Sequence, residues 1–113
     1  MGDGNLGLLR GTLDLLILNA LSTGEKHGYA ISEWIDGMSD GSLLVEEGTL
    51  YPALHRLARQ RLVAAMWGVS ENNRRAKYYA LTAAGRRHLE EQTATWRRYN
   101  EAVEKTLAEG GAA

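Results

Sequence analysis

The hydrophobic positions in the N-terminal half of the chain recur with the spacing of α-helices. Residues 8–22 form the first helical segment, and their leucine and isoleucine side chains surround nearly the whole predicted helix. A helix that is apolar on all sides must be covered on both sides, so we expect another chain to cover part of it. Residues 28–38 carry a single apolar stripe with acidic residues facing outward, and they predict a second, amphipathic helix.

A third helix is predicted over residues 48–60, where Leu50, Leu54 and Leu57 recur at helical spacing and form one buried face. Pro52, the single proline of the chain, is best tolerated in the first turn of a helix because it has no backbone N–H to donate. It indicates that the helix begins just before it, or that the helix is kinked there. The residues that project from the opposite face are Gly48, Pro52, His55, Arg56 and Arg59.

Two strands are predicted after the third helix. Residues 62–69 form a short apolar segment with a loose alternation that ends at Trp67-Gly68, and residues 76–81 form the returning strand. The turn between them, residues 70–74, contains Asn72 and Asn73, which are suited to a positive φ. These segments predict an antiparallel β-hairpin.

The last helix is predicted over residues 83–107, with Thr82 as its N-terminal cap. At about 25 residues it is too long to cover one small core, so we expect it to reach a partner chain. The predicted fold is mostly α with a small β-hairpin: a winged helix-turn-helix followed by a long C-terminal dimerisation helix. We therefore expect a winged-helix domain at 8–82, a dimerisation helix at 83–107, and flexible tails at 1–7 and 108–113.

Composition argues against several classes of function. The chain has 113 residues, 44% of them hydrophobic, which suffices for one domain with a modest core but not for a deep catalytic cleft. It has no cysteine, its histidines show no metal-ligand spacing, and no Ser–His–Asp set or phosphate-binding glycine loop is visible. We expect no enzyme, no cofactor and no metal site. The longest apolar stretch, residues 13–21, is too short to span a membrane and no secretory signal opens the chain, so we expect a cytoplasmic protein without a membrane partner.

The net charge of −1 hides a strongly basic middle segment. Residues 48–89 hold eight of the thirteen lysines and arginines but one of the fourteen acidic residues, which gives this segment +7 and the remainder −8. A basic helix followed by a basic turn suits a protein that reaches into a DNA groove and grips the flanking phosphates. The residues expected to contact double-stranded DNA are Thr49, Tyr51, Pro52, His55, Arg56, Arg59, Asn73, Arg74, Arg75 and Lys77. The alternative interpretation is a solvated helix face and a solubilising hairpin tip.

The chain contains two motifs, GTLYPALHRL at residues 48–57 and RRAKYYALTAAGR at residues 74–86, together with the segments GTLDLLILNAL and HGYAI. These motifs resemble those of the PadR family of bacterial transcriptional regulators. The resemblance covers about residues 8–107 and is strongest to the smaller subfamily with one dimerisation helix. It implies a homodimer that binds operator DNA, usually as a repressor, and that in some members releases DNA when a small aromatic compound binds.

The sequence departs from the family pattern at two positions. Arg61 stands where the family usually has glycine, so the third helix is expected to end without its left-handed cap or to extend slightly. Ala76 interrupts the run of basic residues that is usual in the hairpin, so one phosphate contact is expected to be missing.

By the same resemblance, Trp96 matches a tryptophan that pairs with its symmetry mate around a flat ligand in multidrug-binding relatives. The neighbouring lining positions are Leu15, Asn19 and Leu89. We expect the dimer interface to include Leu8, Leu15, Trp96, Tyr99, Val103 and Leu107. Two other tryptophans, Trp34 and Trp67, are expected in the core.

These features lead to one main hypothesis and two alternatives. The main hypothesis is a homodimeric winged-helix repressor whose two third helices enter successive major grooves, about 34–36 Å apart, on a pseudo-palindromic operator. The first alternative is a ligand-sensing protein whose main event is the binding of an aromatic compound at Trp96. The second is a winged helix used only for contacts with other proteins.

Overall fold

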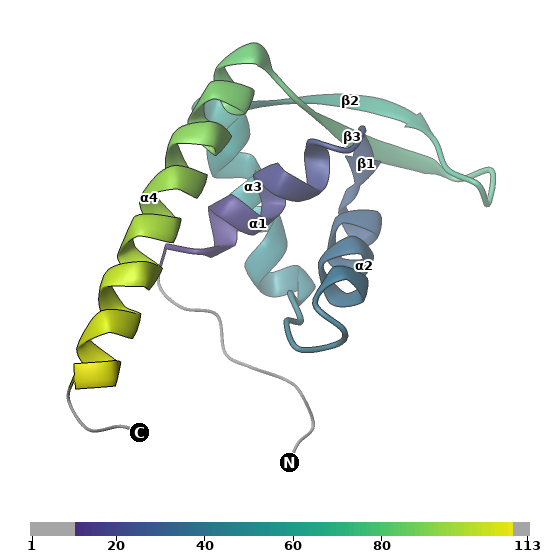
Figure 1. Cartoon of the computed structure of the whole chain (residues 1–113). Helices are drawn as coiled ribbons and strands as arrows, with labels where there is room; N and C mark the ends of the chain where they lie inside the picture. The colour runs from purple at the N-terminus through teal and green to yellow at the C-terminus, as the bar shows by residue number, and fades with distance from the viewer. Residues whose placement is uncertain (1–10, 110–113) are drawn as a thin grey trace.

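The computed structural model describes residues 11–109, and within them helices pack against one face of a small sheet while a longer helix leaves this body (Figure 1). The elements, in order, are α1 (Leu13–Leu21), β1 (Lys26–His27), α2 (Gly28–Met38), α3 (Glu47–Arg59), β2 (Val63–Val69), β3 (Arg75–Leu81) and α4 (Ala83–Glu109). This order is that of a winged helix-turn-helix with a long C-terminal helix, so the predicted fold class is confirmed.

The core is built from the apolar faces that the sequence pattern predicted. The largest fully buried side chains come from all three short helices and from the middle of the sheet: Ile17, Leu18, Ile31, Ile35, Leu50, Leu54, Leu57 and Tyr79. Leu89, in the second turn of α4, joins the same cluster with 8% of its surface exposed. Only the first turns of α4 therefore belong to this core.

The boundaries of the helices differ from the predicted ones at the starts of α1 and α3 and at the end of α4, which runs to Glu109 and so includes the first two residues of the tail predicted at 108–113. α1 begins at Leu13, because Gly11 has a φ of +87° that a right-handed helix cannot contain; the earlier part of the predicted helix, including Leu8, lies outside the described residues. α3 begins at Glu47, so Pro52 lies in its second turn and does not mark the first. The first turn is fixed upstream of the proline, where the N–H groups of Thr49 and Leu50 both bond to the Glu46 carbonyl.

A two-residue strand that the sequence pattern did not predict completes the sheet. β1 pairs with β3, placing Lys26 opposite Tyr79 and His27 opposite Tyr78, and the strand order is β1-β3-β2. His27 also caps α2, because its Nδ1 accepts a hydrogen bond of 3.3 Å from the N–H of Ala30. β1 therefore fixes the start of α2 against the sheet.

The end of α3 corrects the expectation drawn from Arg61. Arg61 itself adopts the left-handed conformation, with a φ of +62°. Its N–H bonds to the carbonyl of Ala58, and the N–H of Leu62 bonds to the carbonyl of Leu57, both at 3.0 Å. This is the hydrogen-bond pattern with which helices end at a glycine. The left-handed conformation costs a non-glycine residue roughly 1–2 kcal/mol, and the two bonds and the burial of Val63 at the start of the following strand offset it.

α4 is fixed to the end of α3 at the point where the hairpin returns. The Thr82 hydroxyl accepts a bond of 2.9 Å from the N–H of Gly85 and lies 3.0 Å from the carbonyl oxygen of Leu62. Gly85 is buried, and a methyl group added to it would overlap the Leu62 carbonyl oxygen. Close backbone approach thus sets the direction in which α4 leaves the body.

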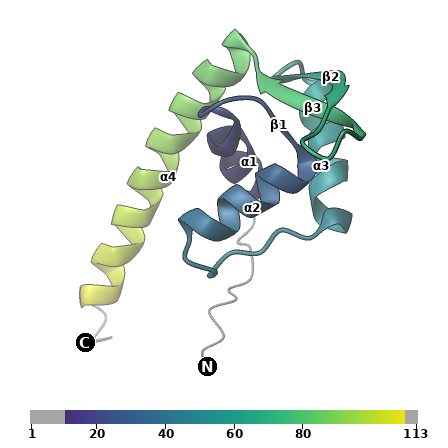
Figure 2. The same cartoon turned by 90° about the vertical axis from the view of Figure 1, so that its right-hand side faces the viewer.

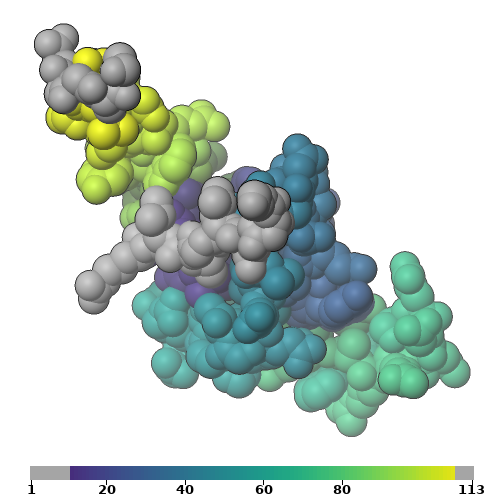
Figure 3. Space-filling model, turned by 90° about the horizontal axis from the view of Figure 1, so that it is seen from below, coloured from purple at the N-terminus to yellow at the C-terminus, as the bar shows by residue number. Residues whose placement is uncertain are grey.

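The C-terminal half of α4 stands clear of the other elements in two perpendicular views (Figures 1 and 2). Seen from below, α4 and the hairpin project from opposite sides of the body (Figure 3). No helix in residues 11–109 is both long and apolar enough to cross a membrane.

We predict that Gly85→Ala lowers the free energy of unfolding by about 1–3 kcal/mol, because the added methyl group meets backbone atoms that cannot move aside. Gly37→Ala is the matched control, since nothing lies within 4 Å of the added methyl group in α2. It should raise stability by about 0.5–1 kcal/mol. Urea unfolding of both variants measures this, and an equal effect at the two positions would contradict the close approach.

Candidate functional site

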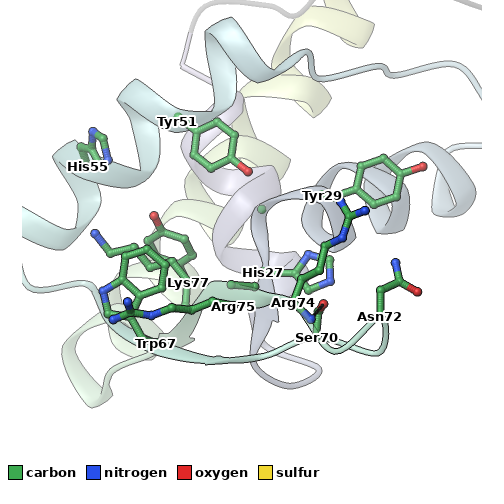
Figure 4. Close-up of a pocket in the computed structure, with 13 residues that line it drawn as sticks. His27, Tyr29, Tyr51, His55, Trp67, Ser70, Asn72, Arg74, Arg75 and Lys77 are labelled. Carbon is green, nitrogen blue, oxygen red and sulfur yellow. Dashed lines mark hydrogen bonds between the residues drawn. The ribbon is translucent and has the colours of Figure 1, made fainter.

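An open groove of about 620 Å³ lies between α3, the start of α2 and the hairpin (Figure 4). We call it the basic groove. Its lining residues are His27, Gly28, Tyr29, Tyr51, His55, Trp67, Ser70, Asn72, Arg74, Arg75, Ala76, Lys77 and Tyr79. Three of them are cations and none is acidic, so the groove is built to hold an anionic surface.

The register of the hairpin explains why its cations face the groove. β2 and β3 pair so that Trp67 lies opposite Lys77 and Val69 opposite Arg75. Side chains of opposed residues share a face, and residues two apart along a strand share it too. Arg75 and Lys77 therefore lie on the same face as the buried Tyr79, which is the face turned toward α3.

On the opposite face of the hairpin, the side chain of Tyr78 on β3 contacts β2. Its ring packs across Gly68, where an added Cβ would lie 3.0 Å from the ring carbons. Its hydroxyl donates a 3.2 Å hydrogen bond to the carbonyl of Val69. His27 meets the ring edge-on with 5.5 Å between the ring centroids. Contacts from both strands and from β1 thus stiffen the hairpin behind the groove.

The hairpin tip has the geometry that its sequence predicts. Asn73 has a φ of +60°, which confirms the expectation for the second asparagine of the pair, whereas Asn72 does not have a positive φ. The N–H of Ser70 bonds to the carbonyl of Arg74 at 2.7 Å, and the N–H of Asn73 bonds to the carbonyl of Ser70 at 2.9 Å. Arg74, just before β3, and Arg75, its first residue, are both exposed.

Trp34 packs against the core, as expected, but Trp67 does not belong to the core, which corrects the sequence-based expectation. Trp67 is 58% exposed, and the guanidinium carbon of Arg75 lies 4.5 Å from the centroid of its ring. The ammonium group of Lys77 lies 5.9 Å from the same centroid. β2 runs past the edge of the helical body, so a side chain on its inner face still reaches solvent.

Most of the α3 residues that the sequence assigned to DNA form its outer surface. Those that are exposed are Thr49, Pro52, His55 and Arg59, whereas Leu50, Ala53, Leu54 and Leu57 are buried on the other side. Of the exposed four, His55 lines the basic groove. The remaining three lie on the part of α3 outside the groove lining.

Arg56 has a partner that the sequence pattern did not indicate. Its guanidinium group donates a hydrogen bond to the carboxylate of Asp14, in the first turn of α1, and forms an ion pair with it. The two side chains are 41% and 35% exposed. A pair this exposed contributes about 0.2–1 kcal/mol to stability, but it turns the guanidinium group toward α1.

Tyr51 is half-buried and lies over Gly28. A methyl group on Gly28 would overlap the tyrosine ring and hydroxyl, so the glycine is needed for close approach. Burial first, and the nearby Glu47 carboxylate second, raise the pKa of Tyr51 above its ordinary value of 10.0. The hydroxyl therefore stays protonated at neutral pH and keeps a proton to donate toward the groove.

A second hollow, of about 470 Å³, lies between α1 and α4. It is lined by Gly11, Thr12, Leu15, Gln92, Thr95, Trp96 and Tyr99. Leu15 and Trp96 from the predicted ligand set line this hollow, whereas Asn19 is exposed outside it and Leu89 is buried in the core. Tyr99 and Leu107 are 68% and 50% exposed, and Val103 is partly buried. Within residues 11–109, no group of three or more His, Cys, Asp or Glu side chains is arranged to hold a metal ion.

Comparison with protein families gives one match over most of the chain. Residues 17–91 match the model of the transcriptional regulator PadR-like family. A Lysinibacillus sphaericus protein named uncharacterized protein X is 30% identical over 97 residues, which cover 86% of this chain and 89% of that protein. Transcriptional regulator YqjI of Escherichia coli is 35% identical over 81 residues, which cover 72% of this chain but 37% of that protein.

Solved structures give the same likeness. A transcriptional regulator from Clostridium thermocellum matches with a TM-score of 0.77 and 30% identity, over 85% of this chain and 93% of that one. A PadR family transcription regulator from Clostridium difficile matches with a TM-score of 0.75 and 30% identity, over 86% and 99%. Bacillus subtilis PadR in complex with operator DNA shares the fold, with a TM-score of 0.65 and 23% identity over 73% of this chain and 47% of that one.

Proposed function

The chain belongs to the PadR-like family of transcriptional regulators, which are not enzymes, and we propose that it is a cytoplasmic homodimeric repressor that binds a pseudo-palindromic operator. The observation that carries the proposal is the basic groove, which is concave, lined by three cations and by no acidic side chain. Its position between α3 and the hairpin suits a duplex whose backbone follows the groove while α3 lies in the major groove. Bacillus subtilis PadR, which shares the fold and is described in complex with operator DNA, supports DNA as the partner.

The contacts of the proposed complex divide between the hairpin and α3. Asn73, Arg74, Arg75 and Lys77 would contact phosphates or the minor groove, and the hydroxyl group of Tyr51 would donate a hydrogen bond to a phosphate oxygen. Base edges would be reached from the exposed side of α3, by Thr49, Pro52, His55 and Arg59. The Arg56 ion pair with Asp14 leaves Arg59 as the stronger candidate for a base contact.

The proposed homodimer uses the part of α4 beyond the core. Trp96, Tyr99 and Leu107 expose large apolar surfaces along this helix, and a second chain would bury them together with Val103 and the exposed side of α1. An interface of this kind would place two α3 helices on one face of the dimer. Their spacing would match half-sites about 34–36 Å apart.

A second candidate function is favoured by the hollow between α1 and α4. Its aromatic lining from Trp96 and Tyr99 suits a flat aromatic compound, whose binding would release the DNA. A third interpretation, a module used only for protein contacts, is disfavoured because it gives no role to the three cations of the basic groove.

We predict that Arg74→Ala/Arg75→Ala weakens binding to operator and scrambled duplex DNA by the same factor. The slope of log affinity against log salt should become flatter by about 0.9 for each phosphate that the variant no longer neutralises. Fluorescence anisotropy titrations at several salt concentrations measure both effects. Arg97→Ala/Arg98→Ala removes the same charge from exposed positions on α4 and should leave the slope unchanged. If the hairpin variant keeps the wild-type slope, the hairpin does not contact DNA.

On α3, the same titrations should separate two arginines. Arg59→Ala should reduce affinity for the operator more than for scrambled DNA, because a base contact contributes about 1–3 kcal/mol of discrimination. Arg56→Ala should reduce that discrimination less, since its guanidinium group is held by Asp14. The opposite ranking would mean that Arg56 breaks its ion pair with Asp14 and contacts the DNA.

We predict that Val103→Glu/Leu107→Glu yields monomers, because two carboxylates would be buried without partners in the α4 interface. Sedimentation or light scattering measures the mass, and DNA affinity should fall because each monomer can occupy one half-site only. Glu101→Gln/Glu104→Gln, at exposed α4 positions, is the control. A Glu variant that remains dimeric would locate the interface elsewhere.

The ligand function predicts that flat aromatic compounds quench tryptophan fluorescence and that Trp96→Ala abolishes the quenching. Trp34→Phe should retain it, since Trp34 packs against the core away from the hollow. Quenching that persists in Trp96→Ala would remove the hollow between α1 and α4 as the binding site.

A further inference from the structure

Trp67 is an exposed tryptophan that contacts two cationic side chains, and neither the core nor the pairing of the strands requires it at this position. It lies on β2 with 58% of its surface exposed, although a ring of this size is usually covered. Two cationic groups lie near the ring. The Arg75 guanidinium carbon is 4.5 Å and the Lys77 ammonium group 5.9 Å from the ring centroid. In Figure 4 the three side chains lie together on the side of the hairpin that faces α3.

The strand register places this ring between the two cations. Lys77 is directly opposite Trp67, and Arg75 is its diagonal neighbour, opposite Val69. Diagonal neighbours lie farther apart than direct pairs, within reach of aromatic and long side chains only. The indole ring fills that distance and gives each cation an electron-rich surface to rest on. Arg75 and Lys77 would otherwise sample many rotamers, since both side chains are long and flexible.

The shape of the hairpin itself is secured by other contacts. The Tyr78 ring covers Gly68 on the opposite face, its hydroxyl bonds to the Val69 carbonyl at 3.2 Å, and His27 packs against the ring edge. The backbone of the tip is closed by the bond of 2.7 Å from Ser70 to the Arg74 carbonyl. Trp67 is therefore not needed to keep the strands paired, and its contacts act on side chains.

We propose that Trp67 is a positioning residue of the DNA-binding hairpin, which holds Arg75 and Lys77 toward the groove. Because the two side chains are already ordered in the free protein, their N–H groups can bind the DNA backbone without a further loss of rotamer freedom. This inference rests on the proposed function. The guanidinium carbon of Arg75 lies over the ring, and this cation–π contact does not use the guanidinium N–H groups as hydrogen-bond donors to an oxygen, so they can still bind phosphate oxygens. A direct contact between Trp67 and DNA is the competing role for the same exposed ring.

The test combines one measurement on the free protein with one on the complex. In the free protein, the indole ring current should shift the Arg75 side-chain proton resonances upfield in wild type, and Trp67→Phe should retain part of this shift. Trp67→Leu, which keeps apolar bulk without a ring, should return them to ordinary values. In the complex, Trp67→Leu should weaken operator binding by about 2–5-fold per hairpin, and Trp67→Phe should recover most of the loss.

A double-variant comparison separates positioning from direct contact. In a chain that carries Arg75→Ala/Lys77→Ala, Trp67→Leu should cause no further loss of affinity, because the groups it acts on are absent. A further loss of about 2–5-fold in that background would show that Trp67 contacts DNA by itself and would overturn the positioning role. Met66→Leu, on the other face of β2 and 43% exposed, is the matched control and should leave affinity unchanged.

The remaining outcomes distinguish this inference from the function on which it rests. Wild type that binds DNA while Trp67→Leu binds equally well would overturn the positioning role alone. Ordinary Arg75 resonances in wild type would overturn it too, whatever the stability of the variants. Wild type that binds no DNA at low salt, with Arg75 still shifted, would overturn the proposed function and the positioning role with it.

Discussion

The pairing of β3 along both of its edges is the interaction on which the other parts of the molecule depend. β3 pairs with β1 on one edge and with β2 on the other. Through β1 it fixes the start of α2, through β2 it carries the hairpin, and through Thr82 it passes directly into α4. Tyr79, in the middle of the strand, is 1% exposed and packs into the helical core. One strand therefore sets where the groove, α3 and the projecting α4 lie relative to each other.

The position of the hairpin relative to the helices brings the cationic side chains together in one groove. The groove collects Arg74, Arg75 and Lys77 from the hairpin, and its lining also includes Tyr51 and Tyr79, whose pKa values are raised by burial. The acidic excess lies elsewhere along the chain. Such a separation favours an anionic partner at one surface and discourages association at the others.

The sequence predicted those parts of the fold that depend on local spacing and on turn chemistry. The bounds of α2 follow from one apolar stripe, and the buried face of α3 follows from the leucines of its inner side. The positive φ of Asn73 follows from the tolerance of asparagine for left-handed backbone. The exposed cations of the hairpin and of α3 were likewise predictable, because charged side chains opposite an apolar stripe remain at the surface.

Only the tertiary structure decided which of these exposed groups face one another. β1 has two residues, too few for any periodicity, and exists because β3 offers it a free edge. Arg61 takes a left-handed conformation because two helix-end hydrogen bonds require one there, although its side chain disfavours it. Arg56 turns to Asp14, and Trp67 lies under Arg75 outside the core. The sequence by itself determined the elements and their buried faces, whereas the partners of the surface side chains depend on contacts between distant segments, which no local pattern encodes.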